Sequence, residues 1–340
     1  MTKRTVYVAM IALVGLAAWA AGASLDPNNP TGNNGLVLID KLGNHVRFVD
    51  PHTFQEISNL PMETAPHDLA FSPDHKTVYV PIYGDGVYGR NPHPGHLIAV
   101  IDLASRQQTG SIDVSPYIAP HGIQVDAAGT LYVTCDLSRK LLVIDPKKRS
   151  IVAAIDTEGT GHWAAVLPDG SKAYVANKND RMFVTVIDLK SRKIIGHVPA
   201  PNGTEGIVAS PDGKRVAVAD HAEPALIMID TATDTVADRI PLEGNSRGAF
   251  KPRYTPDGSK LVVCNLGERS VNILNTADLH GKQTVVKVGK DPMGFAVSPD
   301  GKTLLVANHG DGTVSVVNLA DGRVVTTFMA GTGIETLAYY

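Results

Sequence analysis

The sequence predicts an all-β fold, a seven-bladed β-propeller in which four-stranded antiparallel blades form one closed ring. Three observations predict it. A tight-turn motif occurs six times, a strand-ending Asp or Asn occurs seven times, and the chain ends in a segment that matches only the first strand of the repeat. Repeats of about 40 to 50 residues that each contain four short strands are typical of propeller blades.

The repeat is clearest over residues 292–325, PMGFAVSPDGKTLLVANHGDGTVSVVNLADGRVV. Residues 293–297 alternate apolar and small side chains, SPDG supplies a turn, and residues 303–307 are nearly all apolar, as in a strand buried on both faces. Residues 313–317 and 323–328 complete a set of four strands. A sheet that is apolar on both faces is stable only when it packs against copies of itself.

Two motifs mark the copies. The turn recurs at residues 72–75, 126–129, 167–170, 210–213, 255–258 and 298–301. The polar residue that ends the third strand recurs at Asp50, Asp102, Asp145, Asp188, Asp230, Asn275 and Asn318. The members of this second set are about 42 to 45 residues apart, except for one step of about 52, and this spacing predicts seven blades.

The two ends of the chain are predicted to build one blade together. Residues 35–40 and 45–50 have the pattern of second and third strands, whereas residues 331–340, GTGIETLAYY, begin as a first strand and then stop. Residues 334–340 are therefore expected to pair beside residues 35–40. This pairing closes the ring and removes exposed sheet edges, so that residues 35–340 form a single propeller domain.

The blades contain PHDLAFSPDHKTVYV and TEGIVASPDGKRVAVAD besides the repeat quoted above, and they resemble the YVTN seven-bladed β-propeller family. The resemblance covers nearly all of the chain after the N-terminal segment. The same superfamily also holds lactonase-like and cytochrome d1-haem-domain-like propellers. The resemblance implies the fold, but propellers carry many chemistries, so the function has to be argued from the site.

The N-terminal segment is expected to direct export. Lys3 and Arg4 precede an apolar run, and Ala21-Gly22-Ala23 offers a cleavage site, so residues 1–23 are predicted to be a signal peptide. An uncleaved anchor is the alternative, although the apolar run is short for a membrane span. Residues 24–34 are a polar lead-in, and the mature protein is expected in the periplasm or outside the cell.

Composition restricts the partners. The net charge is −3, 43% of the residues are apolar, and no basic run is present, which argues against nucleic acid or, after signal cleavage, a membrane as a partner. A monomer that acts on a small, possibly anionic, substrate is expected.

The two cysteines, Cys135 and Cys264, occupy equivalent positions in blades three apart, six residues after the turn glycine. Equivalent positions three blades apart lie on nearly opposite sides of a seven-membered ring. A disulfide needs Cα atoms within about 7 Å, so both are predicted to be free and buried.

Two blades depart from the repeat. Residues 83–96, YGDGVYGRNPHPGH, are predicted to be a long loop that lies over one face of the ring. Residues 247–258, RGAFKPRYTPDG, bring Arg247, Lys251 and Arg253 into an expected inner strand, where charged side chains need partners.

The candidate site is found by counting back eight residues from each turn. In ring order the equivalent positions are Glu335, His67, His121, His162, Glu205, Phe250 and Met293. Because the first strand of each blade lines the central channel, five neighbouring blades are expected to direct an imidazole or a carboxylate at one channel mouth. The loop after the second strand opens on the same face, and it contributes His221 and His309, with His93 and His96 from the long loop.

Three imidazoles around an open position are a known arrangement for a catalytic metal. His67, His121 and His162 are therefore predicted to bind a metal ion. Glu205 is expected to be the fourth ligand or the general base, with Glu335 as the alternative ligand. Zinc, copper and iron all remain open for this divalent or redox metal.

Three further residues complete the predicted site. His221 and His309 are expected to transfer protons, and Arg247 is expected to hold an anionic group of the substrate. The lactonase-like resemblance implies metal-dependent hydrolysis of a lactone or a related ester. A histidine-rich site also suits copper or iron, and so an oxidoreductase or an oxidative-cleavage enzyme.

Two other functions stay open: a non-catalytic propeller that binds a protein or cofactor partner, and a channel that holds a haem or quinone without a covalent bond. The sequence contains no C-x-x-C-H, G-x-S-x-G, P-loop or G-x-G-x-x-G motif. Covalently attached haem, an elbow-type serine hydrolase and nucleotide binding are therefore disfavoured.

Overall fold

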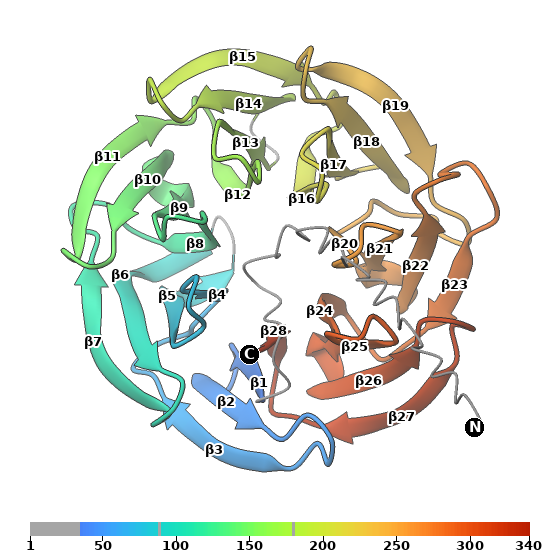
Figure 1. Ribbon diagram of the computed structural model, residues 1–340, viewed down its shortest axis with the longest axis horizontal. Coiled ribbons are helices and arrows are strands. Elements are labelled where there is room, and N and C mark those ends of the chain that lie inside the picture. Colours follow the sequence, from blue (N-terminus) through green and yellow to red (C-terminus); the bar gives the residue numbers. More distant parts are fainter. Residues whose placement is uncertain (1–34, 88–89, 179–180) are drawn as a thin grey trace, which may run out of the picture.

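The computed structural model describes residues 35–340, apart from 88–89 and 179–180, and shows a ring of seven four-stranded antiparallel sheets (Figure 1). The predicted seven-bladed propeller is thus confirmed. The expected signal peptide and lead-in, residues 1–34, lie outside the described part of the chain. Among the described residues, no helix is long and apolar enough to cross a membrane.

Each sheet runs from an inner strand at the channel to an outer strand at the rim. The first sheet contains β28 (Ile334–Tyr339), β1 (Leu36–Asp40), β2 (His45–Val49) and β3 (Glu56–Pro61), and the second contains β4 (Ala70–Phe71), β5 (Thr77–Val87), β6 (Arg90–Asp102) and β7 (Gln107–Asp113). The third contains β8 (Pro120–Val125), β9 (Leu131–Cys135), β10 (Lys140–Asp145) and β11 (Ser150–Asp156), and the fourth contains β12 (Gly161–Val166), β13 (Lys172–Asn177), β14 (Phe183–Asp188) and β15 (Lys193–Pro199). The other three are β16 (Thr204–Ala209), β17 (Arg215–Asp220), β18 (Ala225–Asp230) and β19 (Thr235–Pro241); β20 (Lys251–Tyr254), β21 (Lys260–Asn265), β22 (Ser270–Asn275) and β23 (Thr284–Lys287); and β24 (Pro292–Val297), β25 (Thr303–Asn308), β26 (Thr313–Asn318) and β27 (Val324–Met329). Single turns of 3-10 helix, η1 (Asp136–Ser138), η2 (Leu266–Glu268) and η3 (His309–Asp311), follow second strands of three blades.

The ring closes as predicted. The C-terminal strand β28 pairs antiparallel with β1, so that Leu36 faces Tyr339. Asp40, at the end of β1, accepts hydrogen bonds from the backbone N–H groups of Thr332 and Gly333, 292 and 293 residues away in the chain. The buried Asp40 carboxylate therefore ties the two ends of the ring together.

The inner strands approach one another closely around the channel. A Cβ atom on Gly206 would lie 2.7 Å from the carbonyl oxygen of Phe250 in the next blade, and one on Gly294 would lie 2.5 Å from that of Glu335. Only residues without a side chain allow this approach. This close approach of neighbouring inner strands also brings the side chains at their starts close together.

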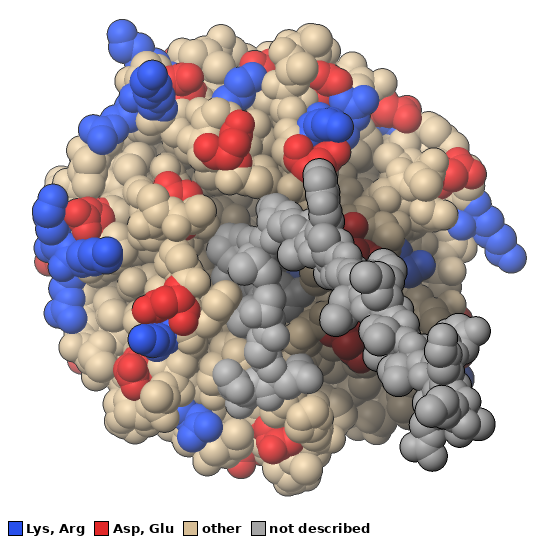
Figure 2. Space-filling model, in the orientation of Figure 1, with Lys and Arg blue, Asp and Glu red and all other residues tan. Residues whose placement is uncertain are grey.

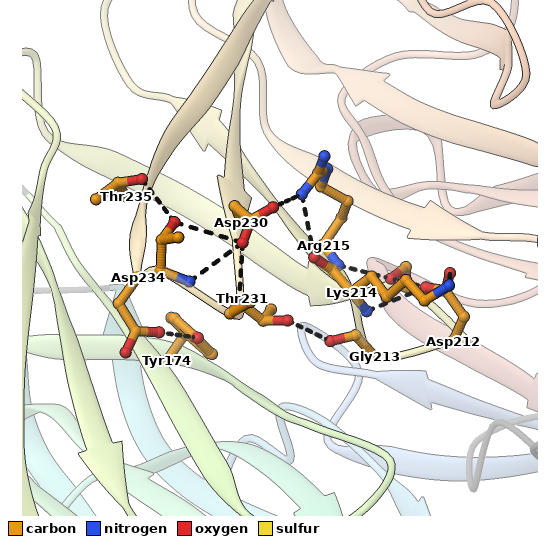
Figure 3. Close-up of polar contacts among 12 residues, drawn as sticks. Tyr174, Asp212, Gly213, Lys214, Arg215, Asp230, Thr231, Asp234 and Thr235 are labelled. Carbon is orange, nitrogen blue, oxygen red and sulfur yellow. Dashed lines mark hydrogen bonds and ion pairs between the residues drawn. The ribbon is translucent and has the colours of Figure 1, made fainter.

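The strand-ending Asp residues are structural, as their position in the repeat suggests. Asp230 accepts a backbone hydrogen bond from Thr233 and pairs with Arg215 of the same blade (Figure 3). Four residues later, Asp234 accepts a hydrogen bond from the hydroxyl of Tyr174 in the neighbouring blade (Figure 3). These turns therefore connect neighbouring blades through side-chain hydrogen bonds.

The prediction of a long loop over residues 83–96 was wrong. The segment extends β5 and β6 into one long hairpin, in which Ile82 faces Leu97 and Gly84 faces Pro94. The positive φ angles of Gly84 and Gly86 let the chain twist without losing its partner strand. Antiparallel pairing thus satisfies backbone groups that a loop would leave to water.

Two smaller expectations are also settled. The inner strand of the irregular blade begins at Lys251, so Arg247 lies in the preceding loop and not in the strand as expected. Cys135, the last residue of β9, and Cys264, near the end of β21, are free and buried, as predicted. Burial raises the pKa of both thiols, so neither is reactive at neutral pH.

Figure 2 shows one face of the ring. On the part of this face that is not drawn in grey, Lys and Arg side chains are spread around the rim and are interspersed with Asp and Glu.

Candidate functional site

The three histidines at the start of successive inner strands form a buried stack. The exposed fractions of His67, His121 and His162 are 3%, 1% and 3%. Their ring centroids are 3.7 Å apart between His67 and His121 and 4.0 Å apart between His121 and His162. The repeat thus brings the three rings side by side, as expected, but they are buried and not exposed to solvent.

A carboxylate caps each end of this stack. Glu335 Oε1 lies 3.6 Å from His67 Nε2, and Glu205 Oε2 lies 3.7 Å from His162 Nε2. Both carboxylates are almost completely buried. The five positions that the repeat predicted as equivalent therefore form one arc across neighbouring blades, which we call the histidine arc.

Each carboxylate of the arc also contacts a lysine and a second histidine. Glu205 Oε1 lies 2.6 Å from Lys178 Nζ and 3.0 Å from His221 Nδ1. At the other end, Glu335 Oε2 lies 3.8 Å from Lys41 Nζ and 3.4 Å from His309 Nδ1. The lysines offset the buried negative charge, as buried carboxylates require.

These four outer residues occupy one position of the repeat, directly after the polar residue that ends a second strand. The pairs are Asp40-Lys41, Asn177-Lys178, Asp220-His221 and Asn308-His309. Sequence reasoning selected the two histidines because of their residue type and missed the two lysines. The signal was available, because equivalent positions in a ring converge whatever residue they carry.

The imidazoles of the stack are neutral at physiological pH. Burial lowers the pKa of His67, His121 and His162 well below the usual value, and the positive charges of Lys41 and Lys251 act in the same direction on all three. Within the described part of the chain, the Nδ1 atoms of His67 and His121 are buried and have no hydrogen-bond partner. Neutral imidazole nitrogens without partners are available as ligands.

The arrangement is a stack and does not form a chelate. Among the residues that the structure describes, no three His, Cys, Asp or Glu side chains form a group that could hold a metal ion together. The planes of neighbouring imidazole rings are tilted by 43° and 38° to each other. The metal-ligand roles of His67, His121, His162 and Glu335 therefore stay predictions.

Two aromatic residues that sequence reasoning missed enclose the stack. Trp163 packs edge-on against His121, with ring centroids 4.8 Å apart, and Tyr83 does so at 5.3 Å. The hydroxyl of Tyr83 donates a 3.0 Å hydrogen bond to Asp136. Burial raises the pKa of Asp136 to about 6. Tyr83 reaches this place on the extended strand β5, which could not be foreseen while the segment was taken for a loop.

Lys251, a charged inner-strand residue of the irregular blade, contacts residues of other blades across the channel. Lys251 Nζ lies 3.8 Å from the centre of the Trp163 ring and 4.0 Å from Asp68 Oδ1. Burial lowers the pKa of Lys251 and raises that of Asp68, and the attraction between the two opposes both shifts. A cation over an aromatic face and near a carboxylate is stabilised in the channel.

The remaining predicted residues lie farther out. Arg247 is exposed, and its side chain crosses over Gly267, so its role in binding an anion stays a prediction. His93 pairs with Asp85 on the exposed hairpin, and His96 pairs with Asp113 at the end of β7, so neither joins the arc.

Comparisons with known proteins support the fold. The family model described as Cytochrome D1 heme domain matches residues 126–332, more than half of the chain. No curated protein sequence matches. The solved structure titled "Kuenenia stuttgartiensis Hydrazine Synthase" is 21% identical, with a TM-score of 0.67, and the alignment covers 80% of this chain and 88% of that chain. At this identity the likeness shows the fold alone. The matches support the propeller superfamily predicted from the sequence and do not single out the YVTN repeat.

Proposed function

The chain belongs to the cytochrome D1 heme domain family, and on that premise we propose that it binds a haem without a covalent bond at the histidine arc and serves in a redox reaction. The observation that carries the proposal is the set of three buried imidazoles, in which the Nδ1 atoms of His67 and His121 have no hydrogen-bond partner among the described residues. The residues fit an iron centre in their donor chemistry, because imidazole is a common axial ligand of haem iron.

The geometry favours a haem over a bare metal ion. A bare ion needs three or more side-chain ligands at one point, and the described residues do not supply such a group. A haem would need only one or two ligands from the protein. His121, in the middle of the stack, would be the first candidate to hold the iron, and His67 and His162 are its neighbours.

The ends of the arc would handle charge and protons. Lys41 and Lys178 are cations beside buried carboxylates, so they can also attract the carboxylates that haems carry. The side chain of His221 is 38% exposed and contacts the buried Glu205 at 3.0 Å. A proton taken from water at His221 can pass to Glu205 Oε1, which gives the buried site a connection to solvent.

The lactone hydrolase predicted from the sequence has no support in the family match, and no contact in the arc favours it over a redox role. When bound, a haem supplies one-electron chemistry. The residues of this chain bind it, exclude water from it and supply protons. The periplasm is the proposed location, because it is where the predicted signal peptide would direct the chain.

The experiment is to purify the full chain from its native host and to measure its absorption spectrum and its iron content. One haem per chain is expected, with a band that shifts on reduction. His121→Ala should lose most of the haem, whereas His280→Ala, which changes an exposed histidine paired with Asp238, should retain it. A colourless protein with one zinc or copper ion would contradict the haem proposal, as would His121→Ala with full haem content.

A further inference from the structure

The channel has a second end, which the proposed haem site does not use. The inner strands start at the histidine arc and finish at the tight turns of the repeat. At these turns lies a cavity of about 420 Å³, lined by inner-strand and turn residues of five successive blades, β4–β7 to β20–β23. A volume of this order is typical of sites for small molecules.

The walls of this cavity are mostly apolar. They include Val125, Ala165, Leu167, Ile207 and Tyr254, together with the prolines of four turns. The turns interlock, since the glycine of one turn packs on the proline of the turn before it, as Gly129 does on Pro73 and Gly258 on Pro211. The cavity is therefore built by packed turns that hold its shape before any ligand arrives.

Polar groups gather at the inner end of the cavity, where Asp68, Lys251 and Arg253 contribute two cations and one anion. Lys251 is buried, and Asp68 Oδ1 lies 4.0 Å from its Nζ, too far for a hydrogen bond. Trp163 also lines the cavity. Its Nε1–H is buried and has no hydrogen-bond partner among the described residues. Lys251 and the Trp163 indole thus present hydrogen-bond donors at the inner end for which the described residues supply no acceptor.

We infer that this end of the channel is a second binding site, which takes a small carboxylate with an apolar or aromatic body. The carboxylate would accept hydrogen bonds from Lys251 Nζ and from the buried indole N–H of Trp163, and the Arg253 guanidinium would add attraction. Of the two carboxylates in the lining, Asp68 lies beside Lys251 and Asp126 belongs to a turn. The apolar body would fill the space between the turns.

Trp163 connects this site to the histidine arc. One side of the indole contacts Lys251 Nζ at 3.8 Å, and its ring centroid lies 4.8 Å from that of His121. A ligand that draws Lys251 away from the indole therefore changes the surroundings of both Trp163 and the arc. The only other tryptophan of the chain is Trp19, in the predicted signal peptide. Tryptophan fluorescence is accordingly a local reporter of the cavity.

The test is calorimetric titration of the haem-free full chain with benzoate, and with benzamide as the neutral probe of the same shape. Saturable benzoate binding is expected, with benzamide at least about tenfold weaker because it lacks the charge. Benzoate should change the tryptophan fluorescence, and Trp163→Phe should abolish that change. Equal affinity for both probes, or no binding of benzoate, would overturn the inference.

Variants locate the site. Lys251→Met should weaken benzoate binding by at least about tenfold, and Asp68→Asn, which removes the competing carboxylate, should strengthen it. Lys302→Met removes the same charge at an exposed turn and should leave binding unchanged. If Lys251→Met does not fold, Arg253→Gln takes its place. Benzoate binding that is unchanged in the cavity variants would refute the site. Haem content plays no part in this measurement, so either proposal can fail alone.

Discussion

Acidification should destabilise the haem-free propeller through the three stacked histidines. His67, His121 and His162 are buried as neutral imidazoles with a pKa well below 6.5, chiefly because burial disfavours the charged form. In the unfolded chain each of them binds a proton near pH 6.5. Below that pH the unfolded state therefore holds more protons than the folded state, so stability is complete above about pH 6.5 and is lost as the pH falls.

The size of the effect follows from the number of histidines. Each group that stays neutral in the fold costs about 1.4 kcal/mol of unfolding free energy per pH unit below 6.5, so three cost about 4 kcal/mol per unit. A domain has only about 5 to 15 kcal/mol in total, so the loss is large. Asp136 acts in the opposite direction, because burial raises its pKa to about 6 and the folded state then takes up a proton there. Asp136 is present in both the wild type and the His121→Gln variant, so its contribution cancels when the two are compared.

The assay is urea unfolding of metal-free and haem-free protein at several values between about pH 7.5 and about pH 5.5. In His121→Gln the decline in unfolding free energy should be smaller by about one third, because one of three neutral imidazoles is gone. The matched control, His280→Gln, changes a surface histidine outside the arc and should keep the decline of the wild type. An unfolding free energy that does not decline in the wild type, or an undiminished decline in His121→Gln, would refute this account of the arc.

Three further outcomes are expected. Deletion of residues 334–340 removes a fully buried inner strand, in which burial of each large apolar side chain contributes about 1.5 to 3 kcal/mol to stability. Circular dichroism should therefore show no cooperative unfolding transition. A truncated chain that still melts near the wild-type temperature would contradict ring closure. Burial acts to raise the pKa of Asp40, but hydrogen bonds from backbone N–H groups and Arg47 outweigh it and lower the pKa. Asp40→Ala should therefore cost about 3 kcal/mol or more of unfolding free energy at neutral pH. Asp50→Ala, which removes hydrogen bonds within a single turn, should cost clearly less, and equal losses would argue against the tie between the chain ends. Both cysteines should react with a thiol reagent only after denaturation and without reductant, and a disulfide found by mass spectrometry would disprove their placement.

Regular spacing made the ring predictable. The recurring turn and strand-ending Asp or Asn establish the number of blades, because each blade is a local unit whose strands pair with sequence neighbours. The same regularity placed the five residues of the histidine arc at equivalent positions. It also carried the signal for Lys41 and Lys178, which was overlooked because lysine was not among the residue types sought.

Other features depend on contacts between blades, which no local pattern records. The stacking of His67, His121 and His162, and their burial, follow from how closely the inner strands approach across the channel. Lys251 finds Trp163 and Asp68 on other blades, so its partners could not be inferred from its own strand. The hairpin at residues 83–96 was mistaken for a loop because its glycines and prolines are turn formers, whereas antiparallel pairing of its described residues, 83–87 with 90–96, determined its structure. Local pairing follows sequence periodicity, but the chemistry of a channel arises from side chains that meet only when the ring closes.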